Sequence, residues 1–244
     1  MSVPLIAVAH GSRDPRAAAT VRELLESVRL ARPGLPVRPA YLDHAAPTLP
    51  QALAGLASAV VLPLLLTEAY HSRVDIPGVL REIRGPRIRY GATLGPHPLL
   101  TRALERRLAE AGVPVEDPEA VRRTAVVLVS AGSSDRRANQ VVARLARRWA
   151  CERGWWAVTA AYASASAPKP GEEVARLLRA GAPRVVVAPY LLAPGYFADR
   201  VREDALGAGA RTVSGVLGAA PELAEIVLER YDQALAAHWL SMPA

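Results

Sequence analysis

The stretch Leu5-Ile-Ala-Val-Ala-His-Gly-Ser-Arg-Asp14 recurs later in the chain as Val126-Val-Leu-Val-Ser-Ala-Gly-Ser-Ser-Asp135. Each copy is an apolar run that ends in a short glycine-containing loop, which is typical of a buried parallel strand and the turn after it. Three further matches occur in the same order, and such an ordered series indicates an internal duplication. The matched pairs are 40–47 with 161–168, 61–66 with 187–192, and 94–98 with 217–221.

Apolar, β-branched segments alternate with amphipathic helical patterns along all 244 residues. This alternation predicts an α/β protein whose parallel sheets are covered on both faces. With the duplication, it predicts two tandem lobes, each a four-stranded parallel sheet flanked by helices, facing each other across a cleft. A single (β/α)₈ barrel is the alternative architecture. The expected strands are 3–9, 37–42, 59–66, 88–94, 124–129, 157–163, 184–192 and 212–217.

The boundary between the lobes is expected near residue 118. Pro114, Asp117 and Pro118 interrupt regular structure there, between the end of the first repeat and the start of the second. We therefore assign residues 1–118 to a first lobe and 119–244 to a second, degenerate lobe.

The composition excludes several classes of protein. With 51% hydrophobic and 22% charged residues, the chain can bury a large core and is not disordered or fibrous. Cys151 is the only cysteine, which rules out an intramolecular disulfide and fits a reducing compartment. The sequence contains no charge-free run long enough for a membrane span, and its start lacks the pattern of a signal peptide. We therefore expect a cytoplasmic protein with no membrane partner.

The formal net charge is +7, and Lys169 is the only lysine among 30 basic residues. Nucleic-acid binding would require a clustered basic face with stacking aromatics, but aromatic residues make up only 5% of the chain and the basic excess is spread over both halves. We expect no nucleic-acid partner. Arginine pairs bidentately with carboxylates, so a polyanionic small substrate remains open.

Ionisable residues gather where the strands of the first lobe end. His10, Asp43 with His44, His71 and His97 each follow one of its expected strands. Ligands of open parallel sheets bind beyond the carboxyl ends of the strands, and a strand order of 2-1-3-4 would bring Asp43, His10 and the loop carrying His71 close together. These side chains therefore form one candidate site.

The second repeat keeps the framework but loses these groups. Gly11, Asp14 and Pro63 have identical counterparts, whereas the ionisable residues do not. This difference predicts a single reactive site, in the first lobe. The replaced pairs are His10 with Ala131, Asp43 with Ser164, His71 with Phe197, and His97 with Ala220.

Two histidines with a nearby carboxylate are suited to holding a divalent metal ion that must later be released. Structural roles are the alternatives for individual residues. Asp14 is expected to cap the helix that follows it, and Ser12 to be a turn residue, because both recur in the second repeat. Asp43 could instead cap the helix beginning near Pro47. No G-x-G-x-x-G, phosphate-binding loop or G-x-S-x-G motif is present, so we expect no nucleotide cofactor and no serine nucleophile.

Two segments together resemble the sirohydrochlorin chelatases, the CbiX/SirB-type class II chelatases. They are His10-Gly-Ser-Arg-Asp-Pro15 and Leu64-Leu-Leu-Thr-Glu-Ala-Tyr-His-Ser-Arg-Val-Asp-Ile-Pro77. The likeness covers the whole chain, since long members of this family are tandem duplications. It implies a lyase-class enzyme that inserts Fe²⁺ or Co²⁺ into sirohydrochlorin without ATP, on the route to sirohaem or cobalamin.

The resemblance also implies roles for individual residues. His10 and His71 would bind the metal. Asp43 stands where characterised relatives have a glutamate, so Asp43 would complete the catalytic set, or His44 or Glu68 would take that role. A proton acceptor is required because metal insertion removes two N–H protons from the macrocycle.

The implied substrate is a flat tetrapyrrole with eight carboxylate arms. Arg13 and Arg73 lie beside the implied metal ligands and are the expected carboxylate-binding residues. A non-catalytic protein that holds the metal or the tetrapyrrole with the same histidines is the alternative function. Because duplication supplies two lobes in one chain, we expect a monomer.

Overall fold

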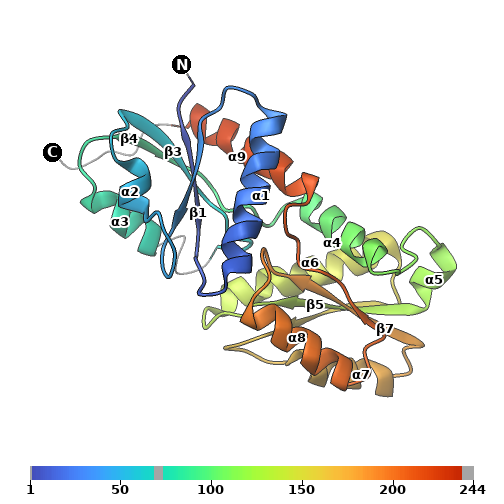
Figure 1. Cartoon of the computed structure of the whole chain (residues 1–244). Coiled ribbons are helices and arrows are strands. Elements are labelled where there is room, and N and C mark those ends of the chain that lie inside the picture. Colours follow the sequence, from blue (N-terminus) through green and yellow to red (C-terminus); the bar gives the residue numbers. More distant parts are fainter. Residues whose placement is uncertain (1, 69–73, 238–244) are drawn as a thin grey trace. The chain divides into compact units, whose positions relative to one another are not determined.

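The computed structural model describes residues 2–68 and 74–237. It divides into two compact units (Figure 1). Unit 1 contains residues 1–99 together with 219–244, and unit 2 contains residues 100–218. The boundary expected at residues 118 and 119 was placed between the two sequence repeats, and it stays a prediction. The compact units divide elsewhere because the last helix of each repeat packs in the unit built by the other repeat.

Unit 1 is built on a parallel sheet of order β2-β1-β3-β4. This is the order under which the sequence analysis would bring Asp43 close to His10. The register pairs Leu5 with both Val37 and Val60, so β1 is central and its five residues are buried. The strands are β1 (Leu5–Ala9), β2 (Val37–Tyr41), β3 (Ser58–Pro63) and β4 (Arg87–Tyr90).

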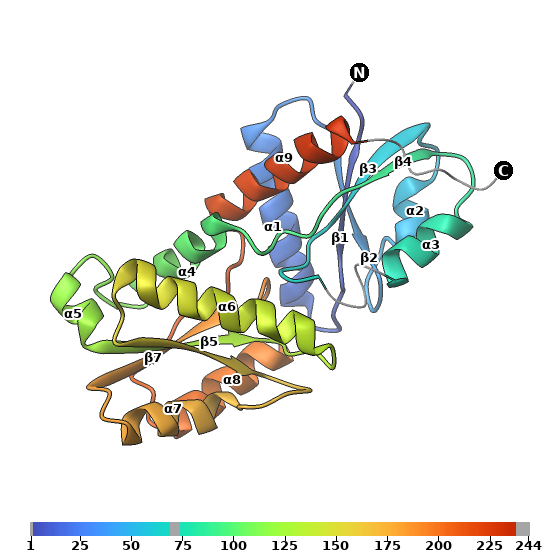
Figure 2. The same ribbon diagram turned by 180° about the vertical axis from the view of Figure 1, so that it is seen from behind.

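Helices cover both faces of the unit 1 sheet (Figure 2). The apolar sides of α2 (Leu49–Leu53) and α3 (Ile76–Glu82) pack with Ile6, Val8 and Val61 into one core. On the other face, α1 (Pro15–Ala31) lies beside α9 (Pro221–Ala236), which also contacts β3 and β4.

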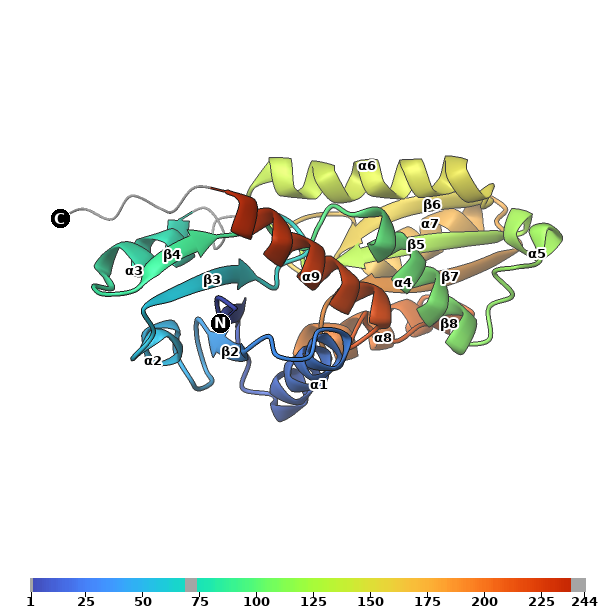
Figure 3. The same cartoon turned by 90° about the horizontal axis from the view of Figure 1, so that it is seen from above.

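Unit 2 repeats this arrangement with the order β6-β5-β7-β8. Helix α6 lies on one face of the sheet, and α7 and α8 lie on the other (Figure 3). The strands are β5 (Thr124–Ser130), β6 (Ala157–Tyr162), β7 (Arg184–Tyr190) and β8 (Thr212–Val213). The helices are α4 (Pro98–Glu110), α5 (Pro118–Arg122), α6 (Arg136–Arg153), α7 (Pro170–Arg179) and α8 (Tyr196–Gly207).

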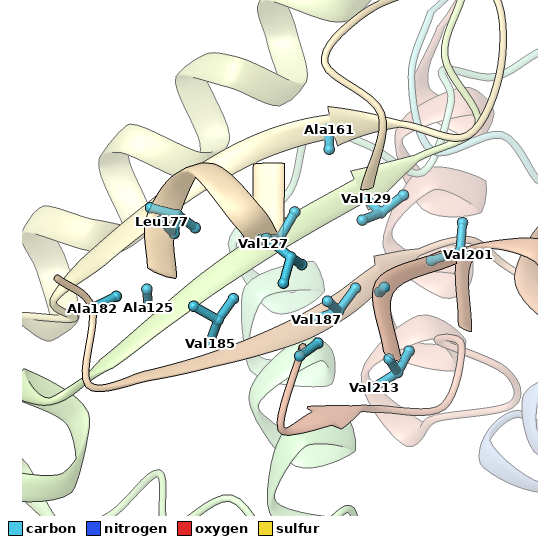
Figure 4. Packing of buried hydrophobic residues seen from close by; sticks show 13 residues of the cluster. Ala125, Val127, Val129, Ala161, Leu177, Ala182, Val185, Val187, Val201 and Val213 are labelled. Carbon is cyan, nitrogen blue, oxygen red and sulfur yellow. The ribbon is translucent and has the colours of Figure 1, made fainter. Parts of the chain in front are cut away.

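The core between the unit 2 sheet and α7 and α8 is built from small and β-branched side chains (Figure 4). Val127, Val187 and Leu177 are at most 1% exposed. Burying one such side chain stabilises the fold by about 1.5–3 kcal/mol. The continuous apolar strands noted in the sequence therefore explain why this parallel sheet is stable when both its faces are covered. Figure 4 labels ten of the thirteen residues: Ala125, Val127, Val129, Ala161, Leu177, Ala182, Val185, Val187, Val201 and Val213.

Helices α4 and α9 are exchanged between the repeats, since α4 packs in unit 2 and α9 in unit 1. Each of these exchanged helices is held by an arginine at the same repeat position. Arg107 of α4 donates from Nε (3.0 Å) and Nη2 (2.8 Å) to the carbonyl of Leu217. Arg230 of α9 donates from Nε to the carbonyl of Thr93 at 3.0 Å. Pro98 matches Pro221, so Arg107 and Arg230 are equivalent, and each binds the loop after the last strand of its unit.

The two parallel four-stranded sheets confirm the predicted α/β architecture, and the alternative of a single barrel is wrong. The strands are shorter than expected at several carboxyl ends. β8 has only two residues, because its pairing with β7 is limited to Thr212 and Val213. Within the described ranges, no helix is both long and apolar enough to cross a membrane.

Candidate functional site

The candidate site begins where β1 and β2 end at the carboxyl edge of the unit 1 sheet. Backbone pairing continues past these strands, because the amide of Leu42 donates to the carbonyl of Ala9 (3.1 Å) and the amide of Asp43 donates to the carbonyl of His10 (2.9 Å). The structure therefore brings His10 and Asp43 together as neighbours on adjacent loops.

Gly11 permits this close approach of the two loops. Its φ is +93°, and a Cβ at this position would lie 1.7 Å from the carbonyl oxygen of Asp43. Gly132 in unit 2 has φ +86°, and its Cβ would lie 2.2 Å from the carbonyl oxygen of Ser164. A side chain is excluded at both positions, so the glycine belongs to the shared framework rather than to the chemistry.

The next residues of the loop start the following helix. Asp14 accepts a hydrogen bond from the amide of Arg16 (2.9 Å), and Ser12 Oγ accepts one from the amide of Asp14 (3.1 Å). Asp135 and Ser133 make the same contacts in unit 2. The predictions that Asp14 is a helix cap and Ser12 a turn residue are confirmed. The side-chain hydrogen bond from Arg16 lowers the pKa of the Asp14 carboxyl below its ordinary value.

Both carboxylate oxygens of Asp43 contact His44. Oδ1 accepts from the His44 amide at 2.8 Å, and Oδ2 lies 3.1 Å from His44 Nε2. His44 has φ +58°, and Ala165, at the same repeat position, has φ +52°, so this backbone turn is independent of the imidazole. The alternative role of Asp43 as a helix cap is wrong, because Thr48 caps α2 in a capping box with Gln51.

His10 presents its imidazole at an exposed position of the same edge. Its Nδ1 lies 3.2 Å from the carbonyl of Gly11, a geometry in which Nδ1 carries the proton and donates it. The lone pair is then on Nε2, which is the form of a neutral imidazole that can bind a metal ion. Arg13, three residues further along, is also exposed.

His97 has a structural role. Its Nδ1 accepts from the amide of Leu99 (3.2 Å), so the proton is on Nε2, which lies 3.0 Å from the carboxylate of Glu229. Glu229 belongs to α9, and His97 therefore ties the loop after β4 to the exchanged helix. Of the four histidines expected at this edge, His97 is already committed to the fold.

Glu68 lies close enough to Tyr90 for its negative charge to act on the phenol. Burial raises the pKa of Tyr90 above its ordinary value, and the charge of Glu68 raises it further. His71 and Arg73 lie outside the described residues, so their expected roles stay predictions. Across residues 2–68 and 74–237, no group of three or more His, Cys, Asp or Glu side chains forms a metal site.

The sequence did not predict two contacts of this edge. The pairing of Asp43 with His44 could have been suspected from their adjacency and from the polar loop in which they lie. The pairing of His97 with Glu229 joins residues 132 positions apart in different repeats, so no local pattern signals it.

Comparison with protein families places both repeats in one group. The CbiX family model matches residues 4–111 and 125–234. A protein named sirohydrochlorin cobaltochelatase, from Priestia megaterium, is 29% identical over 93% of this chain and 78% of its own length. A protein named sirohydrochlorin ferrochelatase, from Bacillus subtilis (strain 168), is 27% identical over 84% of this chain and 79% of its own length.

Solved structures agree with this fold. SirB from Bacillus subtilis with Fe³⁺ superposes with a TM-score of 0.79 at 24% identity, covering 97% of this chain and 96% of SirB. A CbiX structure described as the terminal enzyme for biosynthesis of siroheme in denitrifying bacteria gives a TM-score of 0.72 at 21% identity, covering 96% of this chain and all of the other. At these identities the likeness establishes the two-unit α/β architecture.

Proposed function

The chain belongs to the CbiX family, and from that premise we propose that it is a sirohydrochlorin chelatase. The reaction is the insertion of a divalent metal, Fe²⁺ or Co²⁺, into the macrocycle, with loss of two pyrrole N–H protons and without ATP. Relatives named as a cobaltochelatase and as ferrochelatases, which span most of this chain, support the reaction and leave both metals as substrates. The enzyme is a lyase-class chelatase of sirohaem or cobalamin biosynthesis.

One observation carries the assignment of the site to unit 1. The hydrogen bond from the Asp43 amide to the His10 carbonyl, 2.9 Å long, sets an imidazole and a carboxylate side by side at an open edge of the sheet. The equivalent bond in unit 2, from Ser164 to Ala131, is 2.8 Å long and joins residues with no ionisable group. At this position the shared scaffold carries ionisable side chains in unit 1 and none in unit 2, which supports placing the metal site in unit 1.

His10 would hold the metal ion through Nε2, with His71 as its second ligand. Two imidazoles leave most coordination positions to water, so the ion is bound loosely enough to pass to the four nitrogens of the macrocycle. An enclosed four-ligand protein site would instead retain it, as structural zinc sites do.

Asp43 and His44 would accept the two protons that the macrocycle loses. The Asp43 side chain is 60% exposed and that of His44 36% exposed, so protons can leave this pair to water. The carboxylate also holds the imidazole in position, which is the arrangement that supports general-base catalysis by histidine. In this scheme Asp43 is the third member of the catalytic set, and it acts together with His44.

Arg13 would bind carboxylate arms of the substrate beside the metal, and Arg73 would do the same. Arg13 forms no ion pair with another residue of the described chain, so its guanidinium does not have to give up a protein partner. We further propose a monomer in the cytoplasm. The monomer is supported by the presence of both repeats in one chain, and the location by a composition with a single cysteine, Cys151.

Metal insertion into sirohydrochlorin, followed by absorbance with Fe²⁺ or Co²⁺ and no ATP, tests the proposal. We expect the protein to accelerate insertion well above the rate of the metal and tetrapyrrole alone. Stoichiometric binding of the metal or the tetrapyrrole without acceleration would establish the non-catalytic binding protein instead. Running each metal separately determines which one is the preferred substrate.

A further inference from the structure

The amino edge of the unit 2 sheet, where its strands begin, gathers exposed apolar side chains. Helices α6, α7 and α8 end there, and each leads through a short connection into β6, β7 or β8. Trp156 is 37% exposed, Leu178 37% and Leu206 41%, and all three lie in or beside these connections. They are three of the seven large apolar side chains exposed in the described part of the chain. One exposed apolar side chain is ordinary, whereas such a concentration at one end of a unit indicates an interaction surface.

Contacts join the two leucines to the sheet. The carbonyl of Leu206 accepts from the amide of Gly209 (3.1 Å), and a Cβ on Gly209 would lie 3.0 Å from Leu178 Cδ1. Both leucines therefore border Gly209. Arg211 follows two residues later, and its amide donates to the carbonyl of Val185 (2.7 Å), at the start of β7.

The same edge continues from β7 to β6. Arg184, the first residue of β7, pairs with Thr124 of β5, whose carbonyl accepts from the amide of Trp156 at 3.1 Å. Ala182, in the connection before β7, lies at this end of the core (Figure 4). The residues from Leu178 to Trp156 thus follow one continuous edge that belongs to unit 2 alone.

Arginine is the charged residue of the connections that precede β6, β7 and β8. The remaining positions are glycine and alanine, apart from Trp155, which is buried, and Pro183. The arginine, leucine and exposed tryptophan side chains are therefore the longest groups on this edge. The three connections read Arg153-Gly-Trp-Trp156, Arg179-Ala-Gly-Ala-Pro-Arg184 and Leu206-Gly-Ala-Gly-Ala-Arg211.

Part of this positive charge is already balanced. Arg153 and Arg179 lie in the last turns of α6 and α7, where arginine offsets the negative end of the helix dipole. Arg153 also pairs with a glutamate of α4 at 2.9 Å. By contrast, Arg123, Arg184 and Arg211 have no carboxylate partner among the residues that the structure describes.

Three acidic residues lie before β5, around the start of α5. Asp117 caps that helix, Glu116 lies 3.8 Å from Arg153, and Glu119 is exposed in its first turn. Arg122 ends the same helix. The six arginines in the segments before the four strands outnumber these three carboxylates, so the net charge of the edge is positive.

We propose that the amino edge of unit 2 binds the surface of an anionic phospholipid bilayer. Its arginines pair with lipid phosphates, and its leucine and tryptophan side chains enter the boundary between headgroups and acyl chains. A nucleic acid would use the arginines and leave the leucines without a partner, whereas a neutral apolar partner would leave the arginines unused. We call this edge the lipid-binding face, formed by Arg123, Trp156, Leu178, Arg184, Leu206 and Arg211.

This contact differs from a membrane span. From the sequence we expected no membrane partner, because the chain has no charge-free run long enough to cross a bilayer. Binding to the surface requires no such run, and the cytoplasmic leaflet of a membrane is anionic. The inference therefore revises that expectation for surface contact only, and it does not depend on the proposed function.

Sedimentation with vesicles tests the lipid-binding face. We expect the protein to bind vesicles of phosphatidylglycerol and phosphatidylcholine in equal parts, and to remain in solution with pure phosphatidylcholine. Arg123→Gln/Arg184→Gln/Arg211→Gln should bind about 100-fold more weakly, since each arginine near an anionic surface contributes about 5-fold, and this loss should shrink as salt is raised. Leu178→Ser/Leu206→Ser should bind at least about 10-fold more weakly.

Matched controls lie elsewhere on unit 2. Arg136→Gln/Arg137→Gln/Arg144→Gln removes the same charge from exposed arginines of α6. Tyr196→Ser/Phe197→Ser removes exposed apolar area from the start of α8, at the opposite edge of the sheet. Both variants should bind anionic vesicles like the wild type.

A fluorophore on Cys151 gives a second measurement, which needs no substitution at the lipid-binding face. Cys151 is the only cysteine of the chain, is exposed, and lies two residues before Arg153. An environment-sensitive label there should shift its emission to shorter wavelength when anionic vesicles are added. In Cys151→Ser/Gln140→Cys the label lies roughly 16 Å back along α6 and should respond much less.

The outcomes are distinct. Loss of vesicle binding in the edge variants but not in the controls supports the lipid-binding face. The proposal is wrong if the wild type stays in solution with anionic vesicles, if both triple-arginine variants lose binding equally, or if the two label positions respond equally. Equal or tighter binding of duplex DNA or polyglutamate, measured by anisotropy, would show a general polyanion surface instead. Metal insertion is measured separately, so failure of vesicle binding leaves the chelatase assignment in place.

Discussion

Units 1 and 2 share a sheet order, a glycine loop and a pair of capping residues, yet only unit 1 carries imidazoles at the carboxyl edge of its sheet. The difference distinguishes residues that the fold requires from residues that it does not require. A protein with a single such domain would not allow this distinction. Residues that recur, such as Gly11 with Gly132, are required because the backbone leaves no space for a side chain. Residues that do not recur, such as His10, are not required by the backbone, and their side chains are candidates for the chemistry.

The loop after β2 shows this separation most clearly. His44 and Ala165 both have a positive φ, although one side chain is an imidazole and the other a methyl group. A positive φ is uncommon for residues other than glycine, so the surrounding loop must impose it in both units. The imidazole of His44 is thus an addition to a turn that forms without it.

The largest expected effect tests whether chemistry is confined to unit 1. His10→Ala should lower metal insertion by on the order of 100-fold or more, because loss of a supporting group outside the ligand shell already costs 10–100-fold. His71→Ala should behave in the same way. Ala131→Ser, at the equivalent position of unit 2, should leave the rate unchanged. Initial rates by absorbance measure all three, and near-normal insertion by His10→Ala would show that the site is misplaced.

The glycine pair tests whether the framework is truly shared. Gly11→Ala and Gly132→Ala should each destabilise the fold by about 2 kcal/mol, because the added Cβ meets a carbonyl oxygen at 1.7 or 2.2 Å. Urea unfolding monitored by circular dichroism measures the change. Gly34→Ala is the control, since it also has a positive φ but a Cβ there meets nothing within 4 Å. Equal destabilisation by all three would mean that φ alone, rather than the close approach, makes glycine necessary.

Asp43 and Ser164, which lie beside His10 and Ala131 on the adjacent loops, provide the third test. Asp43→Asn should slow insertion by roughly 10-fold, less than the 10²–10⁴ typical of losing a general base, because His44 remains to accept protons. Ser164→Ala, its counterpart, should have no effect on the rate. The kcat at saturating tetrapyrrole is the relevant quantity. A rate equal to that of the wild type would remove Asp43 from the catalytic set and leave His44 or Glu68.

The arginines of the exchanged helices should matter equally in the two units. Arg107→Gln removes two hydrogen bonds to one backbone carbonyl, and Arg230→Gln removes one. Because both bonds of Arg107 share a single acceptor, each variant should lower the free energy of unfolding by about 1 kcal/mol. Arg144→Gln, an exposed arginine on α6, should change it by no more than a few tenths. Urea denaturation gives the values. A marked difference between the first two variants would show that the two helices are held by different means.

The smallest expected effect concerns an ion pair found on α9 only. Arg32 holds both oxygens of Asp232, whereas position 109, the repeat equivalent of Asp232, is an alanine. Hydrogen bonding to Arg32 lowers the pKa of Asp232, so the pair stabilises the fold above the carboxyl's unfolded pKa and stops doing so as the pH falls through the lower folded value.

Since Asp232 is half exposed, Asp232→Asn should cost less than about 1 kcal/mol at neutral pH. The difference in stability between Asp232→Asn and the wild type should shrink once the pH falls below the unfolded pKa of the carboxyl. It should disappear when the pH is below the lower folded pKa. Thermal unfolding at several pH values tests this. A cost that persists unchanged at acid pH would mean that Asp232 acts through packing rather than charge.

Much of the fold followed from the sequence because its signals are local or repeated. The continuous apolar strands specified parallel sheets, and the match of 5–14 with 126–135 specified two of them. The caps at Asp14 and Asp135 were visible for the same reason. Strand ends were less predictable, as at β8, because pairing with the neighbouring strand and not composition decides where a ladder stops.

The exchange of α4 and α9 could not be read from the sequence. Each helix is the last element of its own repeat in the sequence. Its amphipathic pattern indicates that one face is buried, but the pattern does not indicate which sheet that face packs against. Arg107 and Arg230 contact loops 110 and 137 residues away, beyond any local pattern. The same limit hid the partner of His97, which therefore looked like a free edge histidine.

The position of the exchanged helix α9 determines the order in which the two units can be completed during synthesis. Unit 2 is one uninterrupted segment, residues 100–218, whereas unit 1 consists of residues 1–99 and a second segment that starts at 219. Domains ordinarily complete in the order in which the ribosome releases them. Here the first strands to emerge must wait, with one face of their sheet lacking α9, until the whole of unit 2 has been translated. The unit that carries His10 is therefore the last to be finished, although its synthesis begins first.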